Sequence, residues 1–251
     1  MELNNPEVRL GILRERIATG ASLIALDLAT EFGVSLDTIR RDLIALELAG
    51  TAKRVRGGAV PIIQPSGPLR DRPGTDFAIA NRIALCALQR LRGARTLLID
   101  GGTTCVAFAR VLQASPSLTV ITPSPFVAVE TFKRGIETLT LPGRLSESGG
   151  ISVGISCQEM LEGIAADTAV LGACALDAEF GLSSDDILES TTKRSLSRAA
   201  SETFVLTDAR KVGSRTRYRT LCPSEIDVVV TNADIVSTKS IEARDVEVIH
   251  A

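Results

Sequence analysis

The chain has 251 residues, of which 45% are apolar and 23% charged, the composition of an ordinary globular protein. No stretch reaches the roughly 18 uninterrupted apolar residues of a transmembrane helix, and the start carries no secretory signal, so we expect a cytoplasmic protein without membrane contact. The net charge of -2 excludes an overall electrostatic signal for nucleic acid, and any such signal must be local. Aromatic residues make up only 3%, which argues against recognition of single strands by base stacking.

The five cysteines are odd in number and far apart: Cys86, Cys105, Cys157, Cys174 and Cys222. Because no two form a Cys-x-x-Cys pair, neither a zinc site nor a disulfide framework is predicted. We expect reduced, buried thiols, and no metal or cofactor.

A segment rich in proline and glycine divides the chain. Three prolines and two glycines fall between residues 65 and 74, and neither a helix nor a central strand sustains that composition. We therefore predict an N-terminal domain at residues 1–60, a linker at 61–76 and a larger domain at 77–251.

The N-terminal domain is predicted to be a helix-turn-helix with a wing. Helical periodicity indicates helices at residues 6–19, 25–32 and about 36–49. A short glycine-containing turn joins the second helix to the third, and Ser35 is a suitable N-cap. Residues 51–60 fit a short hairpin.

The third helix has the two faces of a DNA-recognition helix. At 100° per residue, one side carries an apolar stripe, formed by Leu36, Ile39, Leu43 and Leu46. Such a stripe anchors the helix, while short polar and arginine side chains reach base edges and phosphates. A helical protein-interaction domain with solvated arginines is the alternative that periodicity leaves open. The candidate DNA-binding residues are Ser35, Asp37, Thr38, Arg40 and Arg41 on the helix, with Lys53, Arg54 and Arg56 on the wing.

The charge balance of this domain favours association. The first 60 residues contain eight basic and eight acidic side chains, so non-specific attraction to DNA is weak. We therefore expect a homo-oligomer, a dimer or tetramer, that places two or more winged helices on operator half-sites.

The larger domain is predicted to be α/β with a mainly parallel sheet. Apolar runs predict strands at 96–100, 118–122, 137–141, 168–171, 204–208, 226–231 and 246–249, with helices at 79–91, 105–112, 126–133 and 186–200. Strands that alternate with helices imply helices on both faces of the sheet. Ligands of such sheets bind beyond the carboxyl ends of the strands.

Several of these strand ends offer hydrogen-bond donors for an anion. Asp100 and then Gly101-Gly102-Thr103-Thr104 follow the first strand and lead into a helix, where free N–H groups and hydroxyls favour phosphate. Thr122 and Ser124 follow the next strand, and Gly143-Arg144 follow the third. A simple glycine turn is the alternative. The pattern is neither a P-loop nor a dinucleotide-binding fingerprint.

Charged residues later in the chain complete the candidate site. Glu189 and Lys193 lie four residues apart and share one helix face, which also fits a surface salt bridge. Asp208 and Lys211 follow a later strand.

The motifs together resemble the DeoR family of bacterial transcriptional regulators. The string TIRRDL at residues 38–43 and the ending RVRGGA at 54–59 are similar to the DeoR-type winged helix. The strings DGGTT, ITPS, PGR, GLSS, ExxxKR and DxxK, which run in that order from Asp100 to Lys211, resemble the family's C-terminal sensor domain. The resemblance implies a repressor of sugar-metabolism genes that a phosphorylated sugar releases from double-stranded operator DNA. It also implies a sensor fold related to ribose-5-phosphate isomerase and the CoA transferases.

Four positions depart from the family's pattern: Ala80, Pro123, Ser146 and Ala175. These departures bear on the identity of the effector. The alternative function is a sugar-phosphate isomerase or deaminase fused to a DNA-binding domain, with Asp100, Glu189, Asp208, Lys193 and Lys211 as its acid–base groups. The single histidine, His250, lies beside the C-terminus, away from that predicted site.

Overall fold

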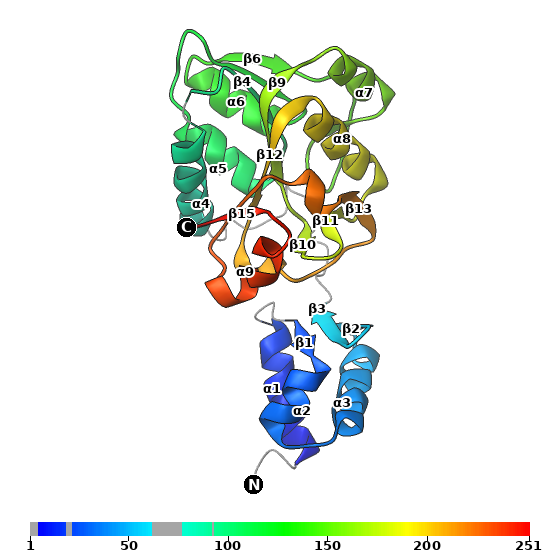
Figure 1. Ribbon diagram of the computed structural model, residues 1–251. Helices are drawn as coiled ribbons and strands as arrows, with labels where there is room; N and C mark the ends of the chain where they lie inside the picture. Colours follow the sequence, from blue (N-terminus) through cyan, green and yellow to red (C-terminus); the bar gives the residue numbers. More distant parts are fainter. Residues whose placement is uncertain (1–4, 19–21, 62–76, 92) are drawn as a thin grey trace.

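The computed structural model describes residues 5–18, 22–61, 77–91 and 93–251, which form a small N-terminal lobe and a larger lobe (Figure 1). Pro61, the first residue of the predicted linker, ends a strand, and the rest of that linker lies outside the described residues. Within the described ranges, every helix is too short or too polar to cross a bilayer.

The small lobe contains the three predicted helices and the predicted hairpin. The helices are α1 (Pro6–Ala18), α2 (Ala25–Phe32) and α3 (Leu36–Leu48), and the strands are β1 (Leu23–Ile24), β2 (Ala52–Val55) and β3 (Gly58–Pro61). The strands form an antiparallel sheet in the order β1-β3-β2. The short β1, which the periodicity did not predict, holds the start of α2 against the hairpin.

Helix α3 begins and packs as its sequence predicts. The Ser35 hydroxyl accepts a hydrogen bond from the Thr38 main-chain N–H at 3.1 Å, the N-cap arrangement. Ile39, Leu43 and Leu46 are buried in one apolar core with side chains from α1 and α2. The opposite side of α3 is therefore left for solvent or a partner.

A buried ion pair joins α1 to α3. Arg9 Nε lies 2.7 Å from Asp42 Oδ2, and Arg9 Nη2 lies 3.2 Å from Asp42 Oδ1. The hydrogen bonds to Asp42 raise the pKa of Arg9 above its ordinary value. Since both side chains are buried, Arg9 stabilises the lobe and does not add to its exposed positive charge.

The large lobe is built on a seven-stranded parallel sheet. In spatial order the strands are β15 (Glu247–His250), β14 (Val228–Thr231), β12 (Ala200–Thr207), β9 (Ala166–Gly172), β4 (Thr96–Ile99), β5 (Thr119–Thr122) and β6 (Glu137–Thr140). All seven strands were predicted. The chain winds outward from β4 in one direction and from β9 in the other, so the sheet has its topological switch point between these two strands.

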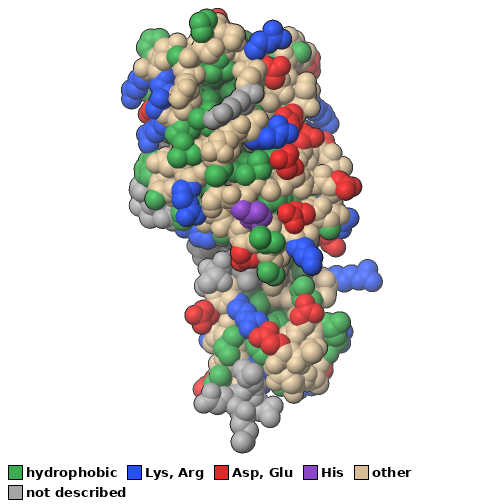
Figure 2. Space-filling model, turned by 60° about the vertical axis from the view of Figure 1, so that its left-hand side comes forward, with side chains coloured by type: hydrophobic (Ala, Val, Ile, Leu, Met, Phe, Trp, Pro, Cys, Tyr) green, Lys and Arg blue, Asp and Glu red, His purple; other side chains and the backbone are tan. Residues whose placement is uncertain are grey.

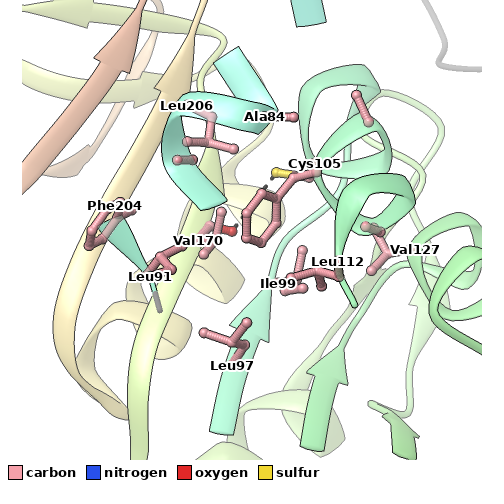
Figure 3. Close-up of a cluster of buried hydrophobic side chains, with 14 of the residues drawn as sticks. Ala84, Leu91, Leu97, Ile99, Cys105, Leu112, Val127, Val170, Phe204 and Leu206 are labelled. Atoms are coloured by element: carbon pink, nitrogen blue, oxygen red, sulfur yellow. Dashed lines mark hydrogen bonds between the residues drawn. The ribbon is translucent and has the colours of Figure 1, made fainter. Parts of the chain in front are cut away.

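Helices cover both faces of this sheet (Figure 1). One face carries α4 (Phe77–Arg90), α5 (Thr103–Val111) and α6 (Pro125–Lys133), and the other carries α7 (Ile155–Glu162), α8 (Ile187–Arg198) and α9 (Ile235–Glu242). Alternate strand residues enter opposite cores: Leu97 and Ile99 pack beneath α5, while Leu98 packs on the other side. Figure 3 shows the first core, where side chains from the helices and strands converge.

Several smaller elements were not predicted. Strands β7 (Arg144–Leu145) and β8 (Ser152–Val153) form a hairpin, and β10 (Ala175–Asp177), β11 (Gly181–Ser184) and β13 (Tyr218–Leu221) form a second sheet. The short helices η3 (Ala209–Lys211) and η4 (Pro223–Glu225) follow β12 and β13. The GLSS string, predicted only as the residues that precede a helix, is therefore a strand.

None of the five cysteines, all within the described ranges, forms a disulfide. Cys105 and Cys157 are buried as expected, and burial raises the thiol pKa of Cys157 to about 11. The expectation of burial is wrong for Cys86, Cys174 and Cys222, which are partly exposed.

The Arg9–Asp42 pair yields a prediction about stability. Asp42→Asn should lower the free energy of unfolding of the small lobe by about 3 kcal/mol, because it leaves a buried guanidinium without its counter-charge. The matched control is Glu31→Gln, which removes the acid of the more exposed Arg16–Glu31 pair and should cost less than about 1 kcal/mol. Urea unfolding followed by circular dichroism measures both, and equal effects would contradict the burial argument.

Candidate functional site

The N-terminal half of α3 presents most of the predicted DNA-binding residues on an exposed side. Ser35, Asp37, Arg40 and Arg41 are exposed, and Thr38 is half-buried. Figure 1 shows the turn between α2 and α3 at the end of the small lobe that faces away from the large lobe. Arg41 Nη2 lies 2.8 Å from Asp37 Oδ2, and such an exposed pair is weak enough for a phosphate to replace.

The three predicted wing residues lie in two places. Lys53 and Arg54 are exposed on β2, and Arg54 Nη1 lies 3.7 Å from Glu47 Oε2. Arg56, in the turn between β2 and β3, lines the cleft between the two lobes. The structure thus places Arg56 toward the large lobe, away from the N-terminal end of α3.

A pocket in the large lobe gathers most of the predicted effector residues. It lies at the switch point, where the carboxyl ends of β4 and β9 meet. Its lining includes eight predicted residues, Asp100, Gly101, Gly102, Thr103, Thr104, Glu189, Lys193 and Lys211. Gly149, Ile151, Gly172, Ala173 and Cys174 also line it and were not predicted. Among the residues that the structure describes, no group of three acidic, histidine or cysteine side chains is placed to hold a metal ion.

Asp100 lies at the centre of this pocket and is fully buried. Its Oδ2 accepts a hydrogen bond from the Gly172 N–H at 3.0 Å and another from Lys193 Nζ. Its Oδ1 is buried without a hydrogen-bond partner in the protein. A buried carboxylate oxygen without a hydrogen bond costs free energy, so a ligand that donates a hydrogen bond to Oδ1 would be favoured here.

Lys193, on α8, forms an ion pair with Asp100 and so balances its negative charge. Its Nζ also donates to the Gly172 carbonyl at 2.8 Å. Burial by itself lowers the pKa of Lys193, but the charge and hydrogen bond of Asp100, together with the nearby Cys174 and Glu189, hold the pKa above its ordinary value. The alternative of a surface Glu189–Lys193 salt bridge is therefore wrong, because Lys193 is buried and pairs with Asp100.

Glu189 fastens a loop over the pocket. Its Oε1 accepts hydrogen bonds from Ser146 Oγ at 2.5 Å and from the Gly149 N–H at 2.6 Å. A Cβ on Gly149 would lie 2.8 Å from Glu189 Oε2, so the loop approaches the carboxylate closely. Ser146 stands at a position where the family resemblance suggests an arginine. Its contact at the pocket is the hydrogen bond that it donates to Glu189.

The start of α5 forms the side of the pocket that favours an anion. Gly102 is the N-cap and has φ +91°, a conformation that a side chain strongly disfavours. Thr103 and Thr104 begin the helix and are half-buried. N–H groups in a first helical turn lack an intrahelical acceptor and carry partial positive charge.

Lys211, at the end of η3, also lines the pocket. Its Nζ donates to the Ala173 carbonyl at 2.8 Å and lies 4.0 Å from Asp208 Oδ2. Asp208 does not line the pocket; it caps η3, and its Oδ1 accepts a hydrogen bond from the Arg210 N–H at 2.9 Å.

Four further predicted residues lie outside the pocket lining. The Thr122 hydroxyl donates to the Ile99 carbonyl at 2.5 Å and accepts from the Ser124 N–H at 3.0 Å. Ser124 caps α6. Gly143 precedes β7, and Arg144 within it is exposed. Thr122 therefore holds the end of β5 to the end of β4, and direct contact of these four residues with an effector stays a prediction.

The remaining departures from the family's pattern are structural. Ala80 packs in the core beneath α4, and Ala175 is buried in β10. The Pro123 carbonyl accepts a hydrogen bond from the Ser152 N–H at 2.7 Å, which attaches the β8 strand to the end of β5.

The pocket-lining residues that were not predicted come from two parts of the chain. Gly172 ends β9, and Ala173 and Cys174 follow it directly, so the rule that located Asp100 at a strand end would also have located them. Gly149 and Ile151 come from the loop that joins the hairpin strands β7 and β8. Its place depends on the contact with Glu189, which sequence spacing does not reveal.

Family models match both lobes of this chain. The DeoR C terminal sensor domain matches residues 79–233, and the DeoR-like helix-turn-helix domain matches residues 9–64. Among solved structures, ribose 5-phosphate isomerase A from Methanocaldococcus jannaschii aligns with a TM-score of 0.40 and 16% identity over 55% of each chain.

Curated relatives align over most of their length. The HTH-type transcriptional repressor GlcR of Bacillus subtilis strain 168 is 31% identical over 208 residues, 82% of this chain and 80% of that protein. The glycerol-3-phosphate regulon repressor of Escherichia coli strain K12 is 29% identical over 209 residues, 82% of this chain and 83% of that protein. With a helix-turn-helix match before a sensor-domain match that spans more than half of its residues, this chain belongs to the DeoR family of transcriptional regulators.

Proposed function

We propose that this protein represses genes for the metabolism of a phosphorylated sugar or polyol, and that this compound releases it from operator DNA. The observation that carries the proposal is the pocket at the switch point. There Asp100 Oδ1 is buried without a donor, close to two lysines and a helix start. Relatives described as repressors, one of them of a glycerol-3-phosphate regulon, support the direction of regulation.

The pocket suggests how such a ligand would lie. Its phosphate would accept hydrogen bonds from the N–H groups and hydroxyls of Thr103 and Thr104, and Lys211, which also lines the pocket, would add a positive charge. A hydroxyl would donate to Asp100 Oδ1, because a phosphate beside that carboxylate would be repelled.

Repression requires two states with different affinities for the ligand. An effector releases DNA only if it binds the DNA-free arrangement more tightly than the DNA-bound one. In this proposal residues 1–60 bind DNA, and residues 77–251 bind the effector and hold the subunits of the oligomer together. The protein acts in the cytoplasm.

The alternative of an isomerase or deaminase has no support beyond a set of acid–base groups. The DeoR family is one of transcriptional regulators, not enzymes. Lys193 is paired with Asp100, and Glu189 accepts a hydrogen bond from Ser146. His250 lies outside the pocket, with its Nδ1 2.8 Å from the Ala233 carbonyl.

The first prediction concerns DNA. Arg40→Ala and Arg41→Ala should each weaken operator binding by about 1–3 kcal/mol, because each removes a contact to a base edge or phosphate. The control is Arg198→Ala, which removes the same charge from an exposed site at the end of α8 and should change affinity little. Fluorescence anisotropy with DNA from upstream of the protein's own gene measures all three. Equal affinities for wild type and both α3 variants would contradict the recognition-helix assignment.

The second prediction concerns the effector. Thr103→Val/Thr104→Val should weaken effector binding at least roughly tenfold, since each hydrogen bond to a charged group contributes about 1.5–3 kcal/mol. Thermal-shift measurements with inorganic phosphate, glycerol 3-phosphate, ribose 5-phosphate and hexose 6-phosphates supply the comparison. Thr191→Val, at a half-buried position of α8 outside the pocket lining, is the matched control. A double variant that responds to an active compound as wild type does would exclude this phosphate position.

The third prediction concerns assembly. The protein should be a dimer or tetramer at micromolar concentration, because a lobe with balanced charge makes too few phosphate contacts for tight binding alone. Light scattering coupled to size exclusion, with and without DNA, measures the mass. A monomer under both conditions would refute the proposal of an oligomer.

A further inference from the structure

A hydrogen bond crosses between the two lobes, which meet at a narrow waist in the space-filling view (Figure 2). The Ser22 hydroxyl donates to the Gly213 carbonyl at 2.7 Å. Gly213 has φ +75°, and a Cβ there would lie only 2.9 Å from Ser22 Oγ, so any side chain would be strained and would press on the contact. Around this bond lies a cleft lined by β1, the β2–β3 turn and α9, so the lobes leave room to move.

The large-lobe end of this contact leads to the effector pocket. Gly213 lies two residues after Lys211, which lines the pocket and donates to the Ala173 carbonyl. The intervening chain is held firmly: the Ser214 hydroxyl donates to the Lys211 carbonyl at 2.7 Å, and the Gly213 N–H donates to the Leu176 carbonyl at 2.8 Å. Residues 209–214, which we call the strap, therefore form a short rigid segment, with Lys211 lining the pocket and Gly213 against Ser22.

The small-lobe end leads to both DNA-contacting elements. Ser22 directly precedes β1, whose Leu23 pairs with Ala59 of the wing strand β3. The N–H of Ala25, the first residue of α2, donates to the Gly57 carbonyl at 2.8 Å in the β2–β3 turn. A displacement at Ser22 is thus passed to the wing and to the helix that positions α3.

We infer that the strap carries the state of the pocket to the DNA-binding lobe through the Gly213–Ser22 hydrogen bond. An anion in the pocket attracts the Lys211 ammonium away from the Ala173 carbonyl. Because the strap is rigid, the Gly213 carbonyl moves with it, and the bond to Ser22 breaks. The DNA-binding lobe then leaves the orientation that fits the operator. The inference rests on the proposed function for the ligand that triggers the movement, and on the contacts above for the connection itself.

The connection is tested without any ligand by a double-mutant cycle in the full-length protein. Lys211→Met loosens the strap from the pocket side, and Ser22→Ala removes the bond at the other end. Amide hydrogen exchange at residues 23–25 and 57–60 reports on the DNA-binding lobe. Each single variant should speed this exchange about fivefold, the effect of one lost hydrogen bond, and the double variant should be no faster than either.

Two control variants distinguish an effect transmitted through the strap from a general loss of stability. Ser22→Thr keeps the hydroxyl and should exchange like wild type. Lys133→Met makes the same change as Lys211→Met on the exposed surface of α6 and should have no effect on these amides. If Lys211→Met leaves exchange in the small lobe unchanged, or if the two effects simply add, the strap does not connect the lobes.

A second arm uses inorganic phosphate and glycerol 3-phosphate as probes. Either probe that stabilises the protein should weaken DNA binding by wild type. Ser22→Ala should reduce this response about fivefold and, by the same linkage, should bind the probe more tightly and not more weakly. An unaltered response in Ser22→Ala would overturn the inference even if the sensor is correctly assigned. If neither probe binds but the exchange cycle shows coupling, the assigned ligand class fails and the strap stands.

Discussion

The buried ion pair between Asp100 and Lys193 is the contact on which the rest of the pocket depends. It lies where the two halves of the sheet diverge, and it joins the end of β4 to α8 and, through Gly172, to β9. An isolated carboxylate at this depth would be strongly disfavoured, so the lysine is what allows an acidic group there at all. The pairing uses only one carboxylate oxygen, which leaves the other for a ligand.

The main architecture was predictable because its signals are local. Each central strand is a short apolar run with β-branched residues, and parallel strands bring their carboxyl ends to one edge, so Asp100 and Thr103 could be assigned to one site. The α3 helix was equally clear, since its stripe and its Ser35 cap lie within one stretch of sequence.

The elements that escaped prediction depend on distant partners. In β11, Ser183 and Ser184 are buried, yet their hydroxyls reach Ala175 and Thr220, which lie 8 and 36 residues away in sequence. A serine pair without such partners resembles a loop, so the pattern indicated no strand. The Arg9–Asp42 pair escaped for the same reason, because charged residues 33 apart give no sign that they meet inside a core.

The division of the pocket between main chain and side chains has an evolutionary consequence. In the proposed function, the phosphate meets backbone N–H groups at the start of α5, which a substitution elsewhere leaves in place. The hydroxyls of the proposed ligand meet side chains, which substitution can replace, and Glu189 with its partner Ser146 holds the loop beside them. Under this proposal, descendants of one ancestral gene can exchange one sugar or polyol for another by a few substitutions while they keep the requirement for a phosphate. Duplicated copies can in this way become specialised to new nutrients without first losing their ability to respond.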